Sequence, residues 1–337
     1  MTRQENRVLN AREYECGATV LQSRPQFLVI ELTQGCNLSC PMCRSSEIAP
    51  GKARLDGSKF EAVADTLFST AEVVDLRGWG ESLILPDVVD YIERTSAVGC
   101  RIRFVSNLSF NRPQVLEALV RHEVLLTCSI DAAEADVLAA LRKGARMNVI
   151  LDNLRSLTSA YSNVDEIVVL CTVQGPSLAS LPKLPAVLAE VGVRQLHFAA
   201  VSSKDPVIGL DFSSSFAVSQ VAQTMEACRR HSITVTLTTS LPGLSVKPMP
   251  RCMRPWTTLY VNYEGRIGYC DHLIGPFAES QLLGTVADGV LNVWNGDAWQ
   301  RIRARHNAKA PQFKKCLKCY REKGEDFESA WLGKSWM

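Results

Sequence analysis

Short apolar runs with the character of β-strands alternate with amphipathic stretches along the first two thirds of the chain. Six of these runs are rich in Val, Ile, Leu and Phe, and they occupy residues 27–32, 73–76, 102–105, 125–130, 166–173 and 195–201. Near-continuous apolar runs are typical of parallel strands that are covered on both faces. Between the runs, apolar residues recur at helical spacing, as at Phe60, Val63 and Leu67. The alternation predicts an α/β fold, a barrel or open barrel of parallel strands with its chemistry at their C-terminal ends.

The texture of the sequence changes after a further predicted helix, at about 214–230, and a predicted strand at 233–237. The next stretch, TTSLPGLSVKPMP, is rich in Pro, Gly and Ser and is the best candidate for a linker. Beyond it lie four cysteines, five of the six tryptophans and only short predicted elements. We therefore predict an N-terminal extension, a barrel and a small cysteine-rich α+β domain, with the boundaries 1–24, 25–240 and 241–337.

Composition narrows the class of protein. The 337 residues are 46% apolar and 21% charged, as in an ordinary globular protein. Lys and Arg number 37 against 35 for Asp and Glu, so nothing favours nucleic acid or an anionic membrane as partner. The polar N-terminus lacks the apolar segment of a signal peptide, and no apolar run reaches the roughly 20 residues of a membrane span. We expect a cytoplasmic protein, in which twelve cysteines indicate metal sites or catalysis rather than disulfides.

Three cysteines, Cys36, Cys40 and Cys43, directly follow the first predicted strand in the segment TQGCNLSCPMCRSS. Loop thiols at these gaps can converge on one inorganic centre. Closed zinc sites use four ligands, generally as two pairs. Three thiolates on a cubane of four irons instead leave one iron open to an external ligand. Taken by themselves, the residues also fit a zinc loop with a distant fourth ligand, or reactive thiols.

The Cys-x3-Cys-x2-Cys pattern after a first strand resembles the radical S-adenosylmethionine (SAM) superfamily, and further motifs follow in the expected order. The resemblance implies a partial (β/α)6 TIM-like barrel. It also implies a [4Fe-4S] cluster held by Cys36, Cys40 and Cys43, whose open iron is chelated by the amino and carboxylate groups of SAM. Met42 stands where the family usually has an aromatic residue over the adenine, and its polarizable thioether suits the same packing.

Segments after the second, third and fourth strands resemble the SAM-binding segments of this family. LRGWGES resembles a Gly-Gly-Glu segment whose backbone receives the SAM amino group, and glycine allows such a close approach. FVSNLS resembles the segment after the third strand, and SIDAA carries a serine that matches a ribose contact. An arginine in LRKG matches the one that pairs with the SAM carboxylate, for which a guanidinium fork is well suited. The implied SAM contacts are Gly78, Trp79, Gly80, Glu81, Ser106, Asn107, Ser129 and Arg142. A tight turn and a solvated helix end are the structural alternatives for these segments.

Four more cysteines lie near the C-terminus, namely Cys252, Cys270, Cys316 and Cys319. Between the first two, alternating TLYVNY, then EGR, then IGYC predicts a β-hairpin. By themselves the four thiols fit a structural zinc site as well as an iron–sulfur cluster. Their spacing resembles the twitch domain, a shortened form of the SPASM domain, which implies one auxiliary [4Fe-4S] cluster with these four ligands. Thiolates on every iron leave no open site, so such a cluster suits electron transfer.

The other cysteines are of a residue type that is commonly buried, and most are expected to pack in the core: Cys16, Cys100, Cys128, Cys171 and Cys228. Cys171, near the end of the fifth strand, could instead face the barrel and donate a hydrogen atom to a substrate radical, as in epimerases of this superfamily. His197 on the sixth strand, and Asp271 and His272 after Cys270, are candidate substrate contacts. A core histidine and an exposed loop are the alternatives for these three.

The resemblance implies that reductive cleavage of SAM yields a 5′-deoxyadenosyl radical, which abstracts hydrogen from a substrate. A flavodoxin or ferredoxin would supply the electron. The cysteine spacing resembles that of the twitch enzyme that dehydrogenates an aminocyclitol in antibiotic biosynthesis. The first hypothesis is thus an oxidoreductase for a sugar, aminocyclitol or nucleoside, with the auxiliary cluster as electron acceptor. A peptide maturase is the alternative, although only about 25 residues precede the first strand, too few for the usual recognition domain. A non-catalytic iron–sulfur or zinc-binding protein is a third hypothesis, which would need no SAM-binding motifs.

Overall fold

The computed structural model describes residues 1–43, 53–201, 207–246, 251–270 and 282–313, together with Cys316, Leu317 and Cys319. These residues form two compact units, which are described separately. The first unit contains the described residues of 1–36, 53–104 and 251–319, and the second those of 37–43 and 105–246. Strand β3 (Arg101–Ser106) runs from the first unit into the second.

The first unit contains a sheet in the order β10-β9-β8-β1-β2-β3. The strands other than β3 are β1 (Phe27–Ile30), β2 (Val73–Asp75), β8 (Thr258–Val261), β9 (Arg266–Gly268) and β10 (Gly284–Thr285). Strand β1 is parallel to both of its neighbours, so that Phe27 lies opposite Val73 and Thr258. Every residue of β1 and β2 is buried, as their near-continuous apolar runs predicted, and every residue of β8 is buried as well. The cysteine-rich segment thus extends the sheet of parallel strands through β8.

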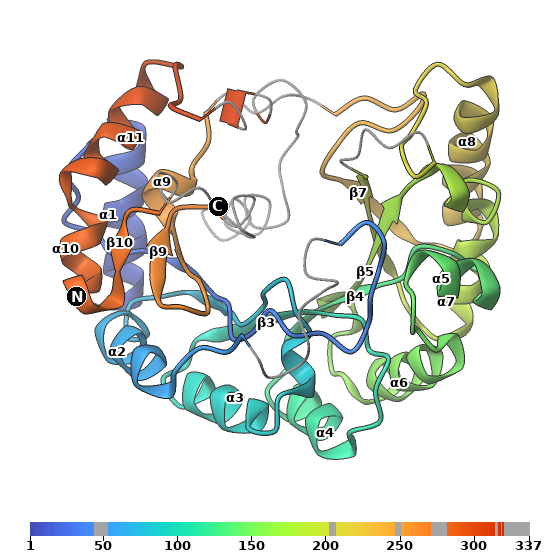
Figure 1. Ribbon diagram of the computed structural model, residues 1–337, viewed down its shortest axis with the longest axis horizontal. Coiled ribbons are helices and arrows are strands. Elements are labelled where there is room, and N and C mark those ends of the chain that lie inside the picture. The colour runs from blue at the N-terminus through green and yellow to red at the C-terminus, as the bar shows by residue number, and fades with distance from the viewer. Residues whose placement is uncertain are drawn as a thin grey trace. The chain divides into compact units, whose positions relative to one another are not determined.

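The helices of the first unit are α1 (Arg3–Glu15), α2 (Gly57–Leu67), α3 (Val88–Ser96), α9 (Arg254–Thr257), α10 (Val290–Trp294) and α11 (Asp297–Asn307). In α2 the predicted apolar stripe of Phe60, Val63 and Leu67 is buried. Its N-cap, Asp56, accepts the backbone N–H of Ser58, which satisfies one of the orphan donors at the helix start. Helices α10 and α11 lie along the β9–β10 end of this sheet (Figure 1).

The N-terminal extension is tied to the C-terminal segment of the same unit. Helix α1 packs against α9. The side chain of Asn10 donates to the carbonyl of Trp256 (2.6 Å), and the Trp256 indole donates to the carbonyl of Ala18 (2.7 Å). The indole of Trp294 donates to the carbonyl of Ser23 (3.0 Å). Buried tryptophans need such acceptors for their N–H groups, and the extension supplies two of them.

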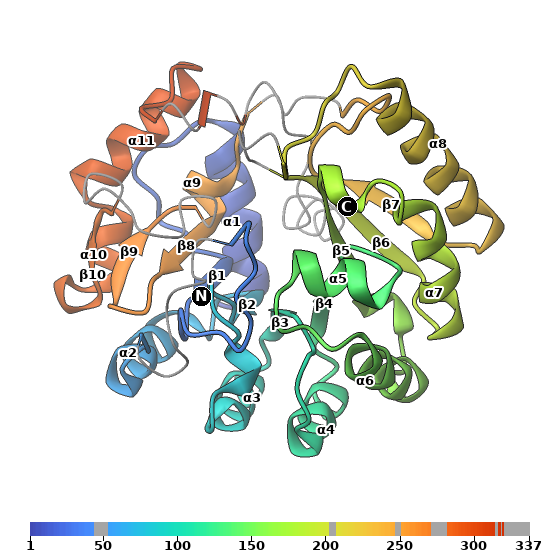
Figure 2. The ribbon, with the colours of Figure 1, turned by 45° about the vertical axis from the view of Figure 1, so that its right-hand side comes forward.

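The second unit contains four parallel strands in the order β4-β5-β6-β7. Their bounds are β4 (Leu125–Ser129), β5 (Ile167–Val173), β6 (Gln195–Ala200) and β7 (Thr234–Leu237). The helices of the unit are α4 (Pro113–Arg121), α5 (Ala135–Leu141), α6 (Met147–Ala160), α7 (Leu184–Glu190) and α8 (Ser215–Arg230). The strands alternate with helices along the chain. Helices α7 and α8 lie beside the β6–β7 end of the sheet (Figure 2). The predicted TIM-like α/β core is confirmed. In the part of the chain that the structure describes, no helix is both long and apolar enough to cross a membrane.

Candidate functional site

The turn after β2 runs directly against the backbone that leads into Cys36. The N–H groups of Gly80 and Glu81 donate to the carbonyls of Thr33 (3.3 Å) and Gly35 (2.9 Å). A Cβ on Gly80 would collide with the Gly35 carbonyl oxygen. A Cβ on Gly78 would lie 2.5 Å from the Cγ of Glu31. The packing around the Gly-Trp-Gly-Glu turn therefore requires glycine at both positions. The sequence analysis explained these glycines by close approach of the backbone to a ligand. In the structure, the backbone of the turn also lies close to the cysteine loop.

This contact predicts the outcome of adding one methyl group. Gly80→Ala is expected to lower the free energy of unfolding by about 2 kcal/mol, the typical cost of overpacking, because the colliding atom belongs to the backbone. Gly57→Ala is the matched control, because a Cβ at that position, the start of α2, meets nothing within 4 Å. Chemical denaturation of both variants measures the difference. Equal stability of the two would contradict the role given to Gly80.

The side chain of Glu81 is buried and points back into its own turn. Its carboxylate accepts the N–H of Leu83 (3.2 Å) and so caps the short 3-10 helix Ser82–Ile84. Trp79, beside it, is half-buried. The Glu81 side chain thus supports the turn.

In the second unit, the segment after β3 braces the cysteine loop through Asn37. The Asn37 side chain donates to the carbonyl of Ser109 (2.9 Å) and accepts from the side chain of Asn107 (2.9 Å). Ser106 accepts the N–H of Leu108 (3.0 Å), a residue in the left-handed region with φ of 49°. Ser106 and Asn107, predicted as SAM contacts, therefore hold the turn and the loop in shape.

Cys40 and Cys43 form the next part of this loop. The N–H of Cys43 donates to the carbonyl of Cys40 (3.0 Å), which makes a tight turn. The N–H of Ser39 donates to the carbonyl of Lys143 (2.9 Å), so the loop is also hydrogen-bonded to the segment after α5. Cys40 is buried, whereas Met42 and Cys43 are half-buried. Cys36, in the first unit, is half-buried as well.

Arg142 lies beside Cys40 and is held by a carboxylate. Its Nε and Nη2 lie 2.7 and 3.1 Å from the two oxygens of Asp131, which is fully buried and also accepts the N–H of Thr172 (2.8 Å). Burial disfavours the guanidinium charge, but the facing carboxylate outweighs it and raises the pKa of Arg142. Burial raises the pKa of the Cys40 thiol, and the Arg142 charge opposes this. A fixed cation thus stands next to a thiol that was predicted to be a ligand.

Asp131 was missed in the sequence analysis, although it had a signal. It follows β4 directly, two residues after Ser129, at the strand end where the chemistry of such folds is placed. Ser129 itself is buried at that end.

Cys171 is fully buried and lies on the face of β5 away from the partly exposed Leu170 and Thr172. Burial, followed by the Asp131 charge, strongly raises the pKa of its thiol, and Cys228 of α8 is also near. This burial fits core packing, and the hydrogen-donor role stays a prediction. His197 contacts Thr236 (2.6 Å) and Thr238 through its two ring nitrogens, as a core histidine does.

The second group of cysteines lies around the predicted hairpin of the first unit. Strands β8 and β9 are antiparallel, with Tyr260 opposite Gly268 and a turn at Gly265, whose φ is 83°. The hairpin is therefore confirmed. It leads to Tyr269, whose hydroxyl lies 3.0 Å from the sulfur of Cys316. Asp271 and His272 lie outside the described residues.

Three of the four predicted auxiliary ligands affect the phenol of Tyr269. Burial raises the pKa of its phenol, and the thiols of Cys316, Cys270 and Cys252 raise it further, in that order. Cys319, half-buried, follows shortly after Cys316. Among the described residues, no three His, Cys, Asp or Glu side chains are arranged to hold a single metal ion. A set made only of thiols is the ligand set of iron–sulfur clusters or structural zinc.

Comparison with known proteins assigns two domains. Residues 30–175 match the radical SAM superfamily, and residues 252–320 match SPASM, an iron–sulfur cluster-binding domain. The AdoMet-dependent heme synthase of Methanosarcina barkeri is 30% identical over 120 residues, which are 34% of this chain and 34% of that protein. The mycofactocin maturase MftC of Mycobacterium tuberculosis is 26% identical over 137 residues, 40% of this chain and 35% of that one. These matches span about a third of the curated relatives.

Solved structures agree with this assignment at the level of the fold. Streptococcus suis SuiB bound to S-adenosylmethionine superposes with a TM-score of 0.67 at 15% identity. The superposition covers 94% of this chain and 75% of SuiB. At that identity the likeness shows a shared fold.

Proposed function

We propose that this chain, which matches the radical SAM superfamily over residues 30–175 and the SPASM domain over residues 252–320, is a radical SAM enzyme that oxidises a small polar metabolite, a sugar, aminocyclitol or nucleoside. The two domains imply a SAM-binding [4Fe-4S] cluster, an auxiliary cluster and SAM itself. When bound, these groups supply the electron that cleaves SAM, the 5′-deoxyadenosyl radical that abstracts hydrogen, and the acceptor of the second electron. The protein binds and positions them.

We propose Cys36, Cys40 and Cys43 as the ligands of the SAM-binding cluster. They lie within eight residues of one chain, so a single loop can bring their thiols to one cluster. The observation that carries the proposal is Arg142, whose fork is fixed by Asp131 and whose neighbour Lys143 accepts the N–H of Ser39, the residue before Cys40. A cation there favours both a ligating thiolate and the carboxylate of SAM. Three further N–H donors of the guanidinium remain after two are used by Asp131, because an arginine carries five.

The remaining roles follow from the turns and from the thiols around Tyr269. We propose that the turn of Gly78 to Glu81 presents its backbone to the amino group of SAM, as its half-buried glycines allow. Ser129 and Met42 are proposed contacts of the ribose and the adenine. Cys252, Cys270, Cys316 and Cys319 are proposed as ligands of a single auxiliary cluster, because the Cys316 sulfur lies 3.0 Å from the hydroxyl of Tyr269, the residue next to Cys270. An electron donor of the flavodoxin or ferredoxin kind completes the proposal.

A peptide maturase is the second candidate. The match to the mycofactocin maturase supports it, and the structure of SuiB bound to the precursor peptide SuiA shares the fold over 92% of this chain. Both candidates require hydrogen abstraction by the same radical, and they differ in the substrate that enters the site.

Anaerobic reconstitution tests the proposal. We expect about eight irons per chain, two clusters of four, and formation of 5′-deoxyadenosine on reduction with dithionite in the presence of SAM. Incubation with deuterated aminocyclitols, sugars, nucleosides and peptides should then transfer label into 5′-deoxyadenosine with the true substrate class. Label from a peptide alone would replace the first candidate by the second. Bound zinc without iron would contradict both.

A further inference from the structure

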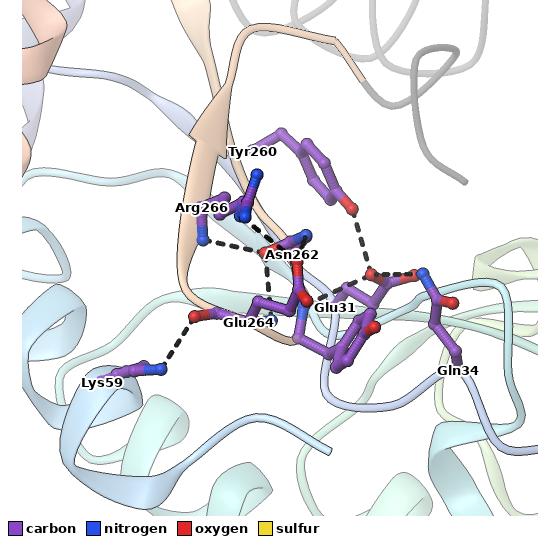
Figure 3. Close-up of polar contacts among 8 residues, drawn as sticks. Glu31, Gln34, Lys59, Tyr260, Asn262, Glu264 and Arg266 are labelled. Atoms are coloured by element: carbon purple, nitrogen blue, oxygen red, sulfur yellow. Dashed lines mark hydrogen bonds and ion pairs between the residues drawn. The ribbon is translucent and has the colours of Figure 1, made fainter. Parts of the chain in front are cut away.

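Glu31, directly after β1, has a fully buried side chain that links three segments of the first unit. Its Oε1 accepts the N–H of Trp79 (3.1 Å) in the Gly-Trp-Gly-Glu turn. Its Oε2 accepts from the side-chain amide of Gln34 (3.2 Å), the hydroxyl of Tyr260 (3.1 Å) and the N–H of Tyr263 (3.3 Å). Figure 3 shows the carboxylate between Gln34 and the hairpin that carries Tyr260. One carboxylate thus connects the cysteine loop, the turn and the SPASM hairpin.

The partners of Glu31 show which form of the carboxyl group the site is built for. Within the described part of the chain, every partner is an uncharged donor. Burial raises the pKa of Glu31, and the four hydrogen bonds oppose this. Because an ionised carboxylate only accepts hydrogen bonds, it satisfies all four donors at once. Removing an ionised carboxylate from water costs free energy even when four donors point at it. There is therefore a structural reason for a carboxylate at this position.

The peptide between Gly78 and Trp79 supplies that reason. In a planar trans peptide the N–H and the C=O point in opposite directions. Since the N–H of Trp79 is donated inward to Glu31, the carbonyl of Gly78 points away from the carboxylate. Donation to a charged acceptor also polarises the peptide and makes this carbonyl a stronger acceptor.

We propose that Glu31 is a positioning residue that fixes the Gly78–Trp79 peptide so that the Gly78 carbonyl receives the ammonium group of SAM. The inference rests on the proposed function. Gly78 supports it independently, because a Cβ there would lie 2.5 Å from the Cγ of Glu31, so the glutamate and the turn are in direct contact. The other side of the carboxylate is anchored by a stiff hairpin, in which Asn262 accepts the N–H groups of Glu264 (3.0 Å) and Arg266 (2.8 Å).

Glu31→Gln tests the assignment with little change of shape. One oxygen becomes an NH2 group, which then faces an N–H donor in either orientation of the amide: that of Trp79, or those of Gln34 and Tyr263. In the reconstituted holoenzyme we expect the KM for SAM in 5′-deoxyadenosine formation to rise about tenfold, the effect of losing one charge-assisted hydrogen bond. The kcat should fall much less, and iron content and melting temperature should stay near those of the wild type.

Tyr260→Phe is the matched control. It removes a buried donor from the same carboxylate but leaves the Trp79 contact in place, so the KM for SAM should stay within about twofold of wild type. If Glu31→Gln does not fold, Glu31→Asp replaces it, because the side chain is one methylene shorter and draws back from Trp79. A KM for SAM that is unchanged in the folded Glu31 variant, or raised equally by Tyr260→Phe, would overturn the inference. A wild type that does not cleave SAM would instead overturn the proposed function.

Discussion

Replacing Cys36, Cys40 and Cys43 together by Ala abolishes the reductive cleavage of SAM. We expect 5′-deoxyadenosine to fall by about a thousandfold or more, to background, because the chemistry requires the group that these thiols are proposed to hold. Iron content should drop from about eight to about four per chain, since the auxiliary ligands are untouched. Chromatographic assay of 5′-deoxyadenosine after reduction with dithionite, with iron analysis of the same sample, measures both.

The matched control for this variant is Cys16→Ala. Cys16 is an exposed cysteine at the end of α1, outside both proposed ligand sets, and its loss should leave iron content and cleavage unchanged. Circular dichroism of the triple variant establishes that it remains folded. A folded triple variant that still makes 5′-deoxyadenosine would show that the three thiols have been given the wrong role.

The strands of the core were predictable because a strand that is buried on both faces consists of a nearly continuous run of apolar residues. The run from residue 27 to 32 predicted β1 well, and the observed strand ends at Ile30. The difference of two residues is small, because the N–H of Glu31 still donates to the carbonyl of Val261 in the neighbouring strand (2.8 Å).

Long-range pairing was the part that sequence pattern could not supply. The alternation in TLYVNY predicted the hairpin, but nothing local indicates that β8 lies parallel to β1. The extension of residues 1–24 likewise gives no sign that it accepts hydrogen bonds from Trp256 and Trp294. Such contacts join segments that are far apart in the sequence. The periodicity of a single sequence describes each segment locally and does not indicate which segments pair.

In the candidate site too, contacts between residues close in sequence could be predicted and contacts between distant residues could not. Arg142 and Asp131 are close in sequence, and a carboxylate at the end of β4 near a predicted cation was a readable signal. Glu31 and Tyr260 are 229 residues apart, and a glutamate at the end of an apolar strand predicts no partner. The residues proposed to bind the cofactors could be found from motifs, whereas the residues that hold those motifs in place were visible only in the structure.

Replacing Cys316 and Cys319 together by Ala should separate the two proposed clusters. We expect 5′-deoxyadenosine formation without substrate to stay within about tenfold of wild type, while iron content falls from about eight to about four per chain. Turnover of the substrate found by label transfer should fall to background, because the proposed acceptor of the second electron is lost. Parallel assays of 5′-deoxyadenosine, of product and of iron measure the three quantities.

Tyr269→Phe is the matched control, because it removes the hydroxyl next to Cys316 and leaves all four thiols. It should keep about eight irons per chain and most of the turnover. If the double cysteine variant keeps its full iron content, the four thiols do not hold a cluster together. If it loses SAM cleavage as completely as the triple variant, the auxiliary cluster feeds electrons to the first cluster instead of taking them from the substrate. Only retained cleavage with lost turnover supports oxidation of the substrate through the SPASM domain, because the electron from the substrate radical then has no acceptor.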